Sequence, residues 1–122
     1  MSELPVFSNG PIKASSIIGT DVMSPGGESL GDIKEIVIDP CSGRIAYAVV
    51  ALGGFLGMGE KLFAIPFSAI NYNQSKNKYV LDISRERLQA APGFDPDHWP
   101  SLADEGWNRE VCKFYERAPY WE

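Results

Sequence analysis

The chain has 122 residues, a length that fits one domain with a single hydrophobic core. Its 16 acidic and 11 basic residues give a net charge of −5, which argues against nucleic acid and anionic membranes as partners because both would be repelled. The sequence has no apolar stretch long enough to cross a bilayer and no signal peptide, so it predicts a cytoplasmic protein with no direct membrane insertion.

Residues 19–83 contain short apolar segments separated by turn-forming residues. Strands are predicted over 21–23, 30–39, 45–52, 62–67, 70–73 and 79–83. The three-residue gap between Ile33 and Ile36 breaks the two-residue period of a strand and predicts a bulge near Lys34. Gly43 is expected to adopt the left-handed conformation in the turn after the second strand. Six short strands with regular turns indicate a mainly β fold, a small closed antiparallel barrel without free edges.

The segment 45–52 is apolar on both of its alternating faces. Ile45, Tyr47 and Val49 point one way, and Ala48, Val50 and Leu52 point the other. This pattern is typical of a strand that is covered on both sides. One cover is the barrel interior, and the other must be the C-terminal tail or another subunit.

The C-terminal part of the chain predicts two helices. Ser84 is expected to cap a helix over 85–91. Ser101 and Asp104 fit a capping box for a second helix over 102–116. This second helix carries one apolar stripe, which is formed by Ala103, Trp107, Val111, Phe114 and Ala118.

The glycine-rich segment 53–59 does not fit a phosphate-binding loop. In such a loop a lysine follows the last glycine directly, whereas here Glu60 separates Gly59 from Lys61. Three large apolar side chains interrupt the glycines: Phe55, Leu56 and Met58. These side chains either fold onto the barrel or form a contact with another molecule.

The sequence offers no set of residues for an active site. His98 is the only histidine, and it lies in a proline-rich connector with no nucleophile beside it. Asp95 and Asp97 are conceivable metal ligands together with His98, but the neighbouring prolines restrict the wrapping that such a site needs. Cys41 and Cys112 fit no metal-ligand spacing and no redox motif, so two free thiols are the simplest interpretation. No catalytic residue, metal or cofactor is therefore predicted.

Several stretches of this sequence, in their order and spacing, resemble the PRC-barrel family. They are ASSIIG at 14–19, LGDIKEIVID at 30–39, GRIAYAVV at 43–50, GGFLGMGEK at 53–61 and IPFSAI at 65–70. The family includes the cytoplasmic domain of the photosynthetic reaction-centre H subunit and the C-terminal domain of a ribosome maturation factor. The resemblance therefore implies a protein-docking module without an active site. The end of the chain is similar to tails of stand-alone bacterial members.

These observations predict a leader over 1–12, a PRC-type barrel domain over 13–95 and a helical tail over 96–122. The expected function is a non-catalytic adaptor that binds a protein partner of unknown identity. The alternative is a regulatory protein that binds a small molecule or a metal. The candidate interaction surface consists of apolar side chains: Phe55, Leu56, Met58, Trp107, Val111 and Phe114. A homodimer is also expected, because an isologous contact could cover the apolar side chains of the glycine-rich segment.

Overall fold

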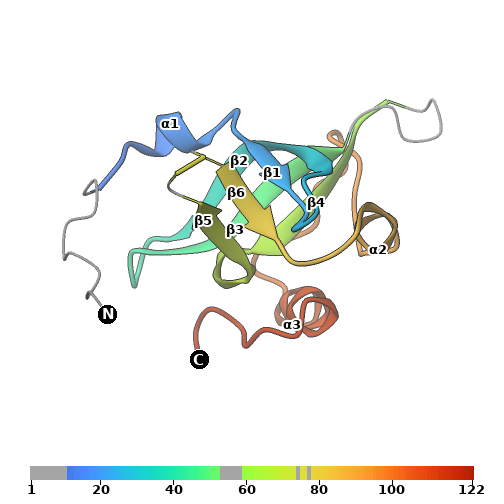
Figure 1. Cartoon of the computed structure of the whole chain (residues 1–122). Coiled ribbons are helices and arrows are strands. Elements are labelled where there is room, and N and C mark those ends of the chain that lie inside the picture. The colour runs from blue at the N-terminus through green and yellow to red at the C-terminus, as the bar shows by residue number, and fades with distance from the viewer. Residues whose placement is uncertain (1–10, 53–58, 74, 77) are drawn as a thin grey trace.

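The computed structural model describes residues 11–52, 59–73, 75–76 and 78–122 (Figure 1). A short helix and six strands come first: α1 (Ala14–Ile17), β1 (Asp21–Met23), β2 (Ser29–Asp39), β3 (Arg44–Leu52), β4 (Lys61–Pro66), β5 (Ile70–Asn73) and β6 (Lys78–Leu81). The 3-10 helix η2 (Phe67–Ala69) joins β4 to β5. Two helices follow, α2 (Arg85–Gln89) and α3 (Glu105–Phe114).

The six strands form one mixed sheet in the order β4-β3-β2-β1-β6-β5. The predicted antiparallel pairing holds for the other four ladders, but β1 and β6 run parallel, with Val22 opposite Tyr79 and Met23 opposite Val80. The sheet curls into a half-barrel, as Figure 1 shows. The predicted closure does not occur within the described ranges, where no ladder joins β4 to β5. The three residues of η2 turn the chain between these two strands instead.

The long strand β2 bends because its register shifts where the sequence predicts a bulge. The pairing with β3 is irregular between Ile33 and Glu35, so the predicted bulge near Lys34 is confirmed. The bend lets β2 pair with β1 at one end and with β3 along most of its length. Gly43, in the turn after β2, has a φ of 77° and confirms the predicted left-handed position.

Strand β3 lies in the middle of the hydrophobic core. All residues from Ala46 to Leu52 are buried, as the apolar pattern on both faces predicts. The curled sheet covers one face, and α3 packs against the other, where Trp107 lies 5.5 Å from Tyr47 between ring centroids. Figure 1 shows α3 below the sheet, far from α1. The second cover of β3 is therefore the C-terminal tail of the same chain.

Both C-terminal helices are shorter than the sequence predicts. Ser84 caps α2 as expected, since its hydroxyl accepts a hydrogen bond from the Arg87 amide at 3.1 Å. The start of α3 differs, because the residue that caps it is Asp104 and not Ser101. The Asp104 carboxylate accepts from the Trp107 amide at 3.0 Å. Within the described ranges, no helix has the length and apolar character that crossing a membrane requires.

Candidate interaction surface

The six residues of the predicted interaction surface separate into two groups. Phe55, Leu56 and Met58 lie outside the described residues. Trp107, Val111 and Phe114 all lie on α3, but the stripe they form packs largely against the chain's own sheet. Only 1% of the Val111 surface is exposed, so a partner cannot reach this side chain.

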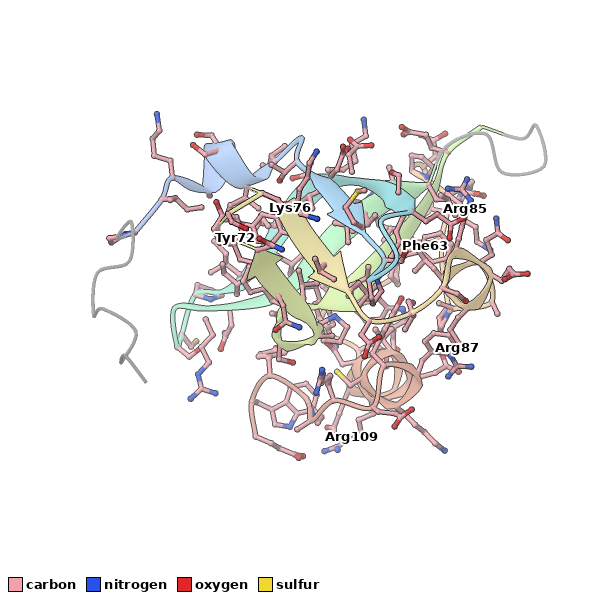
Figure 2. All side chains as sticks on the ribbon, in the orientation of Figure 1. Phe63, Tyr72, Lys76, Arg85, Arg87 and Arg109 are labelled. Atoms are coloured by element: carbon pink, nitrogen blue, oxygen red, sulfur yellow. The ribbon has the colours of Figure 1, made fainter. Side chains whose placement is uncertain are left out.

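Trp107 and Phe114 are half-buried and keep part of their surface. The Trp107 ring packs on Tyr47 of β3. The guanidinium of Arg87 lies 4.3 Å from the centre of the Phe114 ring, which links α3 to α2. Figure 2 shows Arg87 beside α2, on the side of the molecule where the two helices meet. The apolar stripe thus serves mainly to hold the tail on the barrel.

A buried polar network joins α3 to the centre of β3. The Tyr47 hydroxyl donates to the side-chain oxygen of Asn108, and both residues are buried. The Asn108 amide group donates in turn to the carbonyl oxygens of Leu102 at 3.0 Å and Asp104 at 2.8 Å. A buried asparagine with all of these partners satisfied fixes one orientation of the helix. The network therefore fixes the segment that leads into α3 against β3.

Burial favours the neutral forms of two ionisable side chains where α3 packs on β3. Burial raises the pKa of Tyr47 well above its ordinary value. Burial also raises the pKa of the Cys112 thiol, although the nearby Tyr47 hydroxyl opposes the shift. Both cysteines are free thiols, with Cys41 exposed and Cys112 buried. A buried thiol with a raised pKa is a poor nucleophile, so this region has no features of a catalytic cysteine site.

Beyond α3 the chain reverses its direction and returns along the helix. Glu116 has a φ of 57°, the left-handed conformation that commonly ends helices and is unusual for a residue other than glycine. The returning segment is held on one side by Arg44 of β3, whose guanidinium donates to the Tyr120 carbonyl at 3.0 Å. On the other side, Arg109 of α3 pairs with Glu122 at 3.4 Å and lies 5.3 Å from the Trp121 ring centre.

Arg109 is also fixed by its own helix. Its guanidinium pairs with Glu105, one turn earlier, at 2.8 Å. Figure 2 shows Arg109 on the outer side of α3, away from the sheet. The aromatic end of the chain is thus attached both to the sheet and to the exposed side of the helix.

This arrangement creates a surface that we call the tail face, on which the apolar side chains of Ile38, Leu102, Ala103, Tyr120 and Trp121 lie beside the charged side chains of Asp39 and Glu105. Three shallow depressions, of about 370, 260 and 230 Å³, adjoin it, and Tyr120 lines all three. Ile38, Leu102 and Trp121 are among the most exposed large apolar side chains of the described residues. Charged side chains surround the largest depression: Arg44, Arg117 and Glu122.

The residues considered for a metal site do not form one. His98 Nδ1 lies 3.7 Å from a carboxylate oxygen of Asp95, and both side chains are largely exposed. Among the residues with described positions, no three histidine, cysteine or carboxylate side chains come together as metal ligands would.

Sequence reasoning did not identify the tail face. The sequence pattern indicates only that Ile38 belongs to a strand, and Tyr120 and Trp121 follow the predicted helix without any periodic pattern. The available signal is the pair of adjacent aromatic residues after Pro119, a composition that is typical of contact surfaces.

Six short strands curled into a half-barrel, with a helix closing one side, define a small β domain of the barrel type. The sequence profile of the PRC-barrel domain matches residues 10–88, which is more than half of the chain. The chain therefore belongs to the PRC-barrel family, as the sequence resemblance predicts. No curated protein sequence matches the chain.

Proposed function

We propose that this PRC-barrel protein is a non-catalytic interaction module that binds another protein through the tail face. The observation that carries the proposal is the exposure of Ile38, Leu102 and Trp121 around depressions that meet at Tyr120. Large apolar side chains that are exposed close together cost free energy in water, and on a folded protein such a group commonly marks a binding site.

The chemistry of the tail face fits a protein partner better than a small ligand. The two depressions lined by Leu102 have volumes of only about 260 and 230 Å³, which is below the usual size of small-molecule sites. Tryptophan, tyrosine and arginine contribute more binding energy in protein interfaces than other residues do, and here Trp121, Tyr120 and Arg44 lie together. We expect the partner to insert an apolar side chain beside Tyr120 and to place polar groups against the charged rim.

The tail face is also held in place before any partner arrives. Arg44 fixes the backbone at Tyr120, and Arg109 fixes Glu122 and the Trp121 ring. A surface that is already ordered loses less side-chain entropy on binding, which favours affinity.

The experiment compares two tryptophans that are almost equally exposed. Trp121 on the tail face is 40% exposed, and Trp99 on the connector is 39% exposed and packs on Phe94. Immobilised wild-type chain is used to isolate partners from a lysate of the native cells, and the partner that is recovered is then purified. Its affinity is measured for wild type, Trp121→Ser and Trp99→Ser.

We expect Trp121→Ser to weaken binding by more than about tenfold, as is typical of a central aromatic residue. Trp99→Ser should bind like the wild type. Equal affinities for the wild type and Trp121→Ser would exclude the tail face as the docking surface. Failure to isolate any protein under native conditions would count against the interaction module itself.

A further inference from the structure

On the outer face of the half-barrel, we infer a binding site for a small amphipathic anion with one carboxylate and a short apolar body. The site is a groove of about 570 Å³ over strands β1, β5 and β6 and the turn after β1. None of its lining residues belongs to the tail face. The proposed ligand is therefore independent of the protein partner.

The floor of the groove is a product of the parallel pairing of β1 and β6. Met23 and Val80 are register partners in this ladder, and both side chains line the groove. Both side chains are partly exposed. Burial alternates along the two strands, and the side chains that point into the core are those of Val22, Tyr79 and Leu81. Pro25, in the turn after β1, extends the apolar end.

The opposite end of the groove carries positive charge. Lys78 begins β6, and Lys76 lies in the turn that precedes it. Lys78 pairs with Asp21 at 3.2 Å, whereas Lys76 makes no ion pair with another described residue. The part of the groove lining that the structure describes contains these two lysines and no carboxylate, although the chain as a whole is acidic. Figure 2 shows Lys76 in front of the sheet, near β6.

The turns at both ends of the groove are fixed by local hydrogen bonds. In the turn after β1, the Ser24 hydroxyl accepts from the Glu28 amide at 3.1 Å, and the Gly27 amide donates to the Ser24 carbonyl at 2.9 Å. In the turn before β6, the Asn73 side-chain oxygen accepts from the Ser75 hydroxyl at 2.8 Å and the Lys76 amide at 3.2 Å. These bonds hold Ser24, Gly27 and Lys76 at the rim of the groove.

The volume of the groove and its two lysines indicate the class of ligand. A volume of about 570 Å³ lies within the range of small-molecule sites, which are mostly apolar with a few polar groups that fix orientation. A carboxylate accepts charge-assisted hydrogen bonds from ammonium groups. A carboxylate bound at Lys76 and Lys78 would leave the apolar body over Met23 and Val80. A cation of the same shape would be repelled by the lysines.

The test uses octanoate as the probe, with octylammonium, octan-1-ol and acetate as comparisons. Each is titrated into the full chain, and binding is followed residue by residue through backbone amide chemical shifts. We expect octanoate to bind several-fold more tightly than octan-1-ol, and octylammonium and acetate to bind at least tenfold more weakly than octanoate. The shifts should centre on Met23, Lys76, Lys78 and Val80.

A matched pair of lysines controls for general charge effects. Lys78 and Lys34 each pair with one carboxylate, at 3.2 and 3.5 Å, and their side chains are 41% and 45% exposed. Lys78→Met should weaken octanoate binding about tenfold, which corresponds to about 1.4 kcal/mol, and Lys76→Met should act in the same direction. Lys34→Met should have no effect. Circular dichroism of the three variants verifies that they are folded.

Three results would overturn the inference. The first is equal binding of octanoate and octylammonium, since the lysines would then contribute nothing. The second is an unchanged affinity in the folded Lys76→Met and Lys78→Met variants. The third is a set of shifts centred on Arg44 and Arg117, which line the depression beside Tyr120.

Discussion

At the scale of single residues, two buried tyrosine hydroxyls have opposite environments. The Tyr47 hydroxyl donates to Asn108, whereas the buried Tyr115 hydroxyl has no hydrogen-bond partner among the described residues. A hydroxyl that is buried without a partner loses its interaction with water and gains nothing in return. The two tyrosines should therefore respond differently when their hydroxyl groups are removed.

Tyr47→Phe should lower the free energy of unfolding by about 1–3 kcal/mol, because it leaves the Asn108 oxygen buried and unpaired. Tyr115→Phe should leave the free energy of unfolding unchanged or raise it by up to about 1 kcal/mol. Urea unfolding of both variants at neutral pH measures the difference. An equal loss in the two variants would mean that the Tyr115 hydroxyl has a partner in solution.

The same buried groups predict how stability depends on alkaline pH. Burial raises the pKa of Tyr47 and Tyr115 above the ordinary 10.0, and it raises the pKa of Cys112 above 9.0. The folded chain then keeps these protons to a higher pH than the unfolded chain does. Stability from these groups is therefore complete below about pH 9 and is lost as the pH rises beyond the unfolded values.

Urea unfolding at several pH values between about 7 and 11 should show a plateau followed by a steep fall. In Tyr115→Phe the fall should be shallower by up to about 1.4 kcal/mol per pH unit, because one of the titrating groups is gone. An identical slope in the wild type and this variant would contradict the raised pKa of Tyr115.

At the scale of elements, the close approach of β2 to β3 depends on a glycine. Gly31 has a φ of 122°, and a Cβ at this position would lie 2.3 Å from the Ala51 carbonyl oxygen. Gly27 has a similar φ of 92°, but a Cβ there would meet nothing within 4 Å. Alanine substitutions at Gly31 and Gly27 therefore separate the free-energy cost of a strained backbone from the cost of a steric clash between strands.

Gly31→Ala should destabilise the fold by more than about 3 kcal/mol, because strain and steric clash act together. Gly27→Ala should cost about 1–2 kcal/mol, from the strained φ alone. Thermal unfolding of both variants compares the two values. Similar losses would indicate that β2 and β3 can move apart at this point without penalty.

The elements that could be predicted from the sequence are those set by local signals. Ser84 as a cap, the bulge near Lys34 and the left-handed Gly43 each depend on neighbouring residues only. The parallel pairing of β1 with β6 depends on contacts between segments far apart in the chain, and a strand of three residues carries too little pattern to show its direction. Ser101 and Asp104 are both residue types that cap helices, and the one that caps α3 is Asp104.

At the scale of the whole molecule, the C-terminal tail completes the hydrophobic core by covering the second face of β3. The sequence shows that the strand 45–52 needs a cover on both sides, but it leaves open whether the tail or another subunit provides the second cover. The packing of Val111 and Trp107 on the sheet identifies the tail. The tail face could not be predicted, because it depends on the reversal at Glu116, where a glycine would have been the usual signal.

Self-association through Phe55, Leu56 and Met58 stays a prediction. If these side chains pair with themselves in an isologous dimer, light scattering after size-exclusion chromatography should give a dimer mass at about 100 μM chain. Phe55→Ser combined with Leu56→Ser should then give a folded monomer. A wild-type monomer at this concentration would exclude such a dimer.

Contact with a partner protein at the tail face is the central claim, and photo-crosslinking in living cells tests it most directly. Benzoylphenylalanine is introduced at Trp121 in one variant and at the equally exposed Trp99 in another. The account predicts a crosslinked species of one defined mass from position 121, which disappears when Leu102 is also changed to Ser, and no such species from position 99. The absence of a crosslink at position 121, or the same species from both positions, would contradict it.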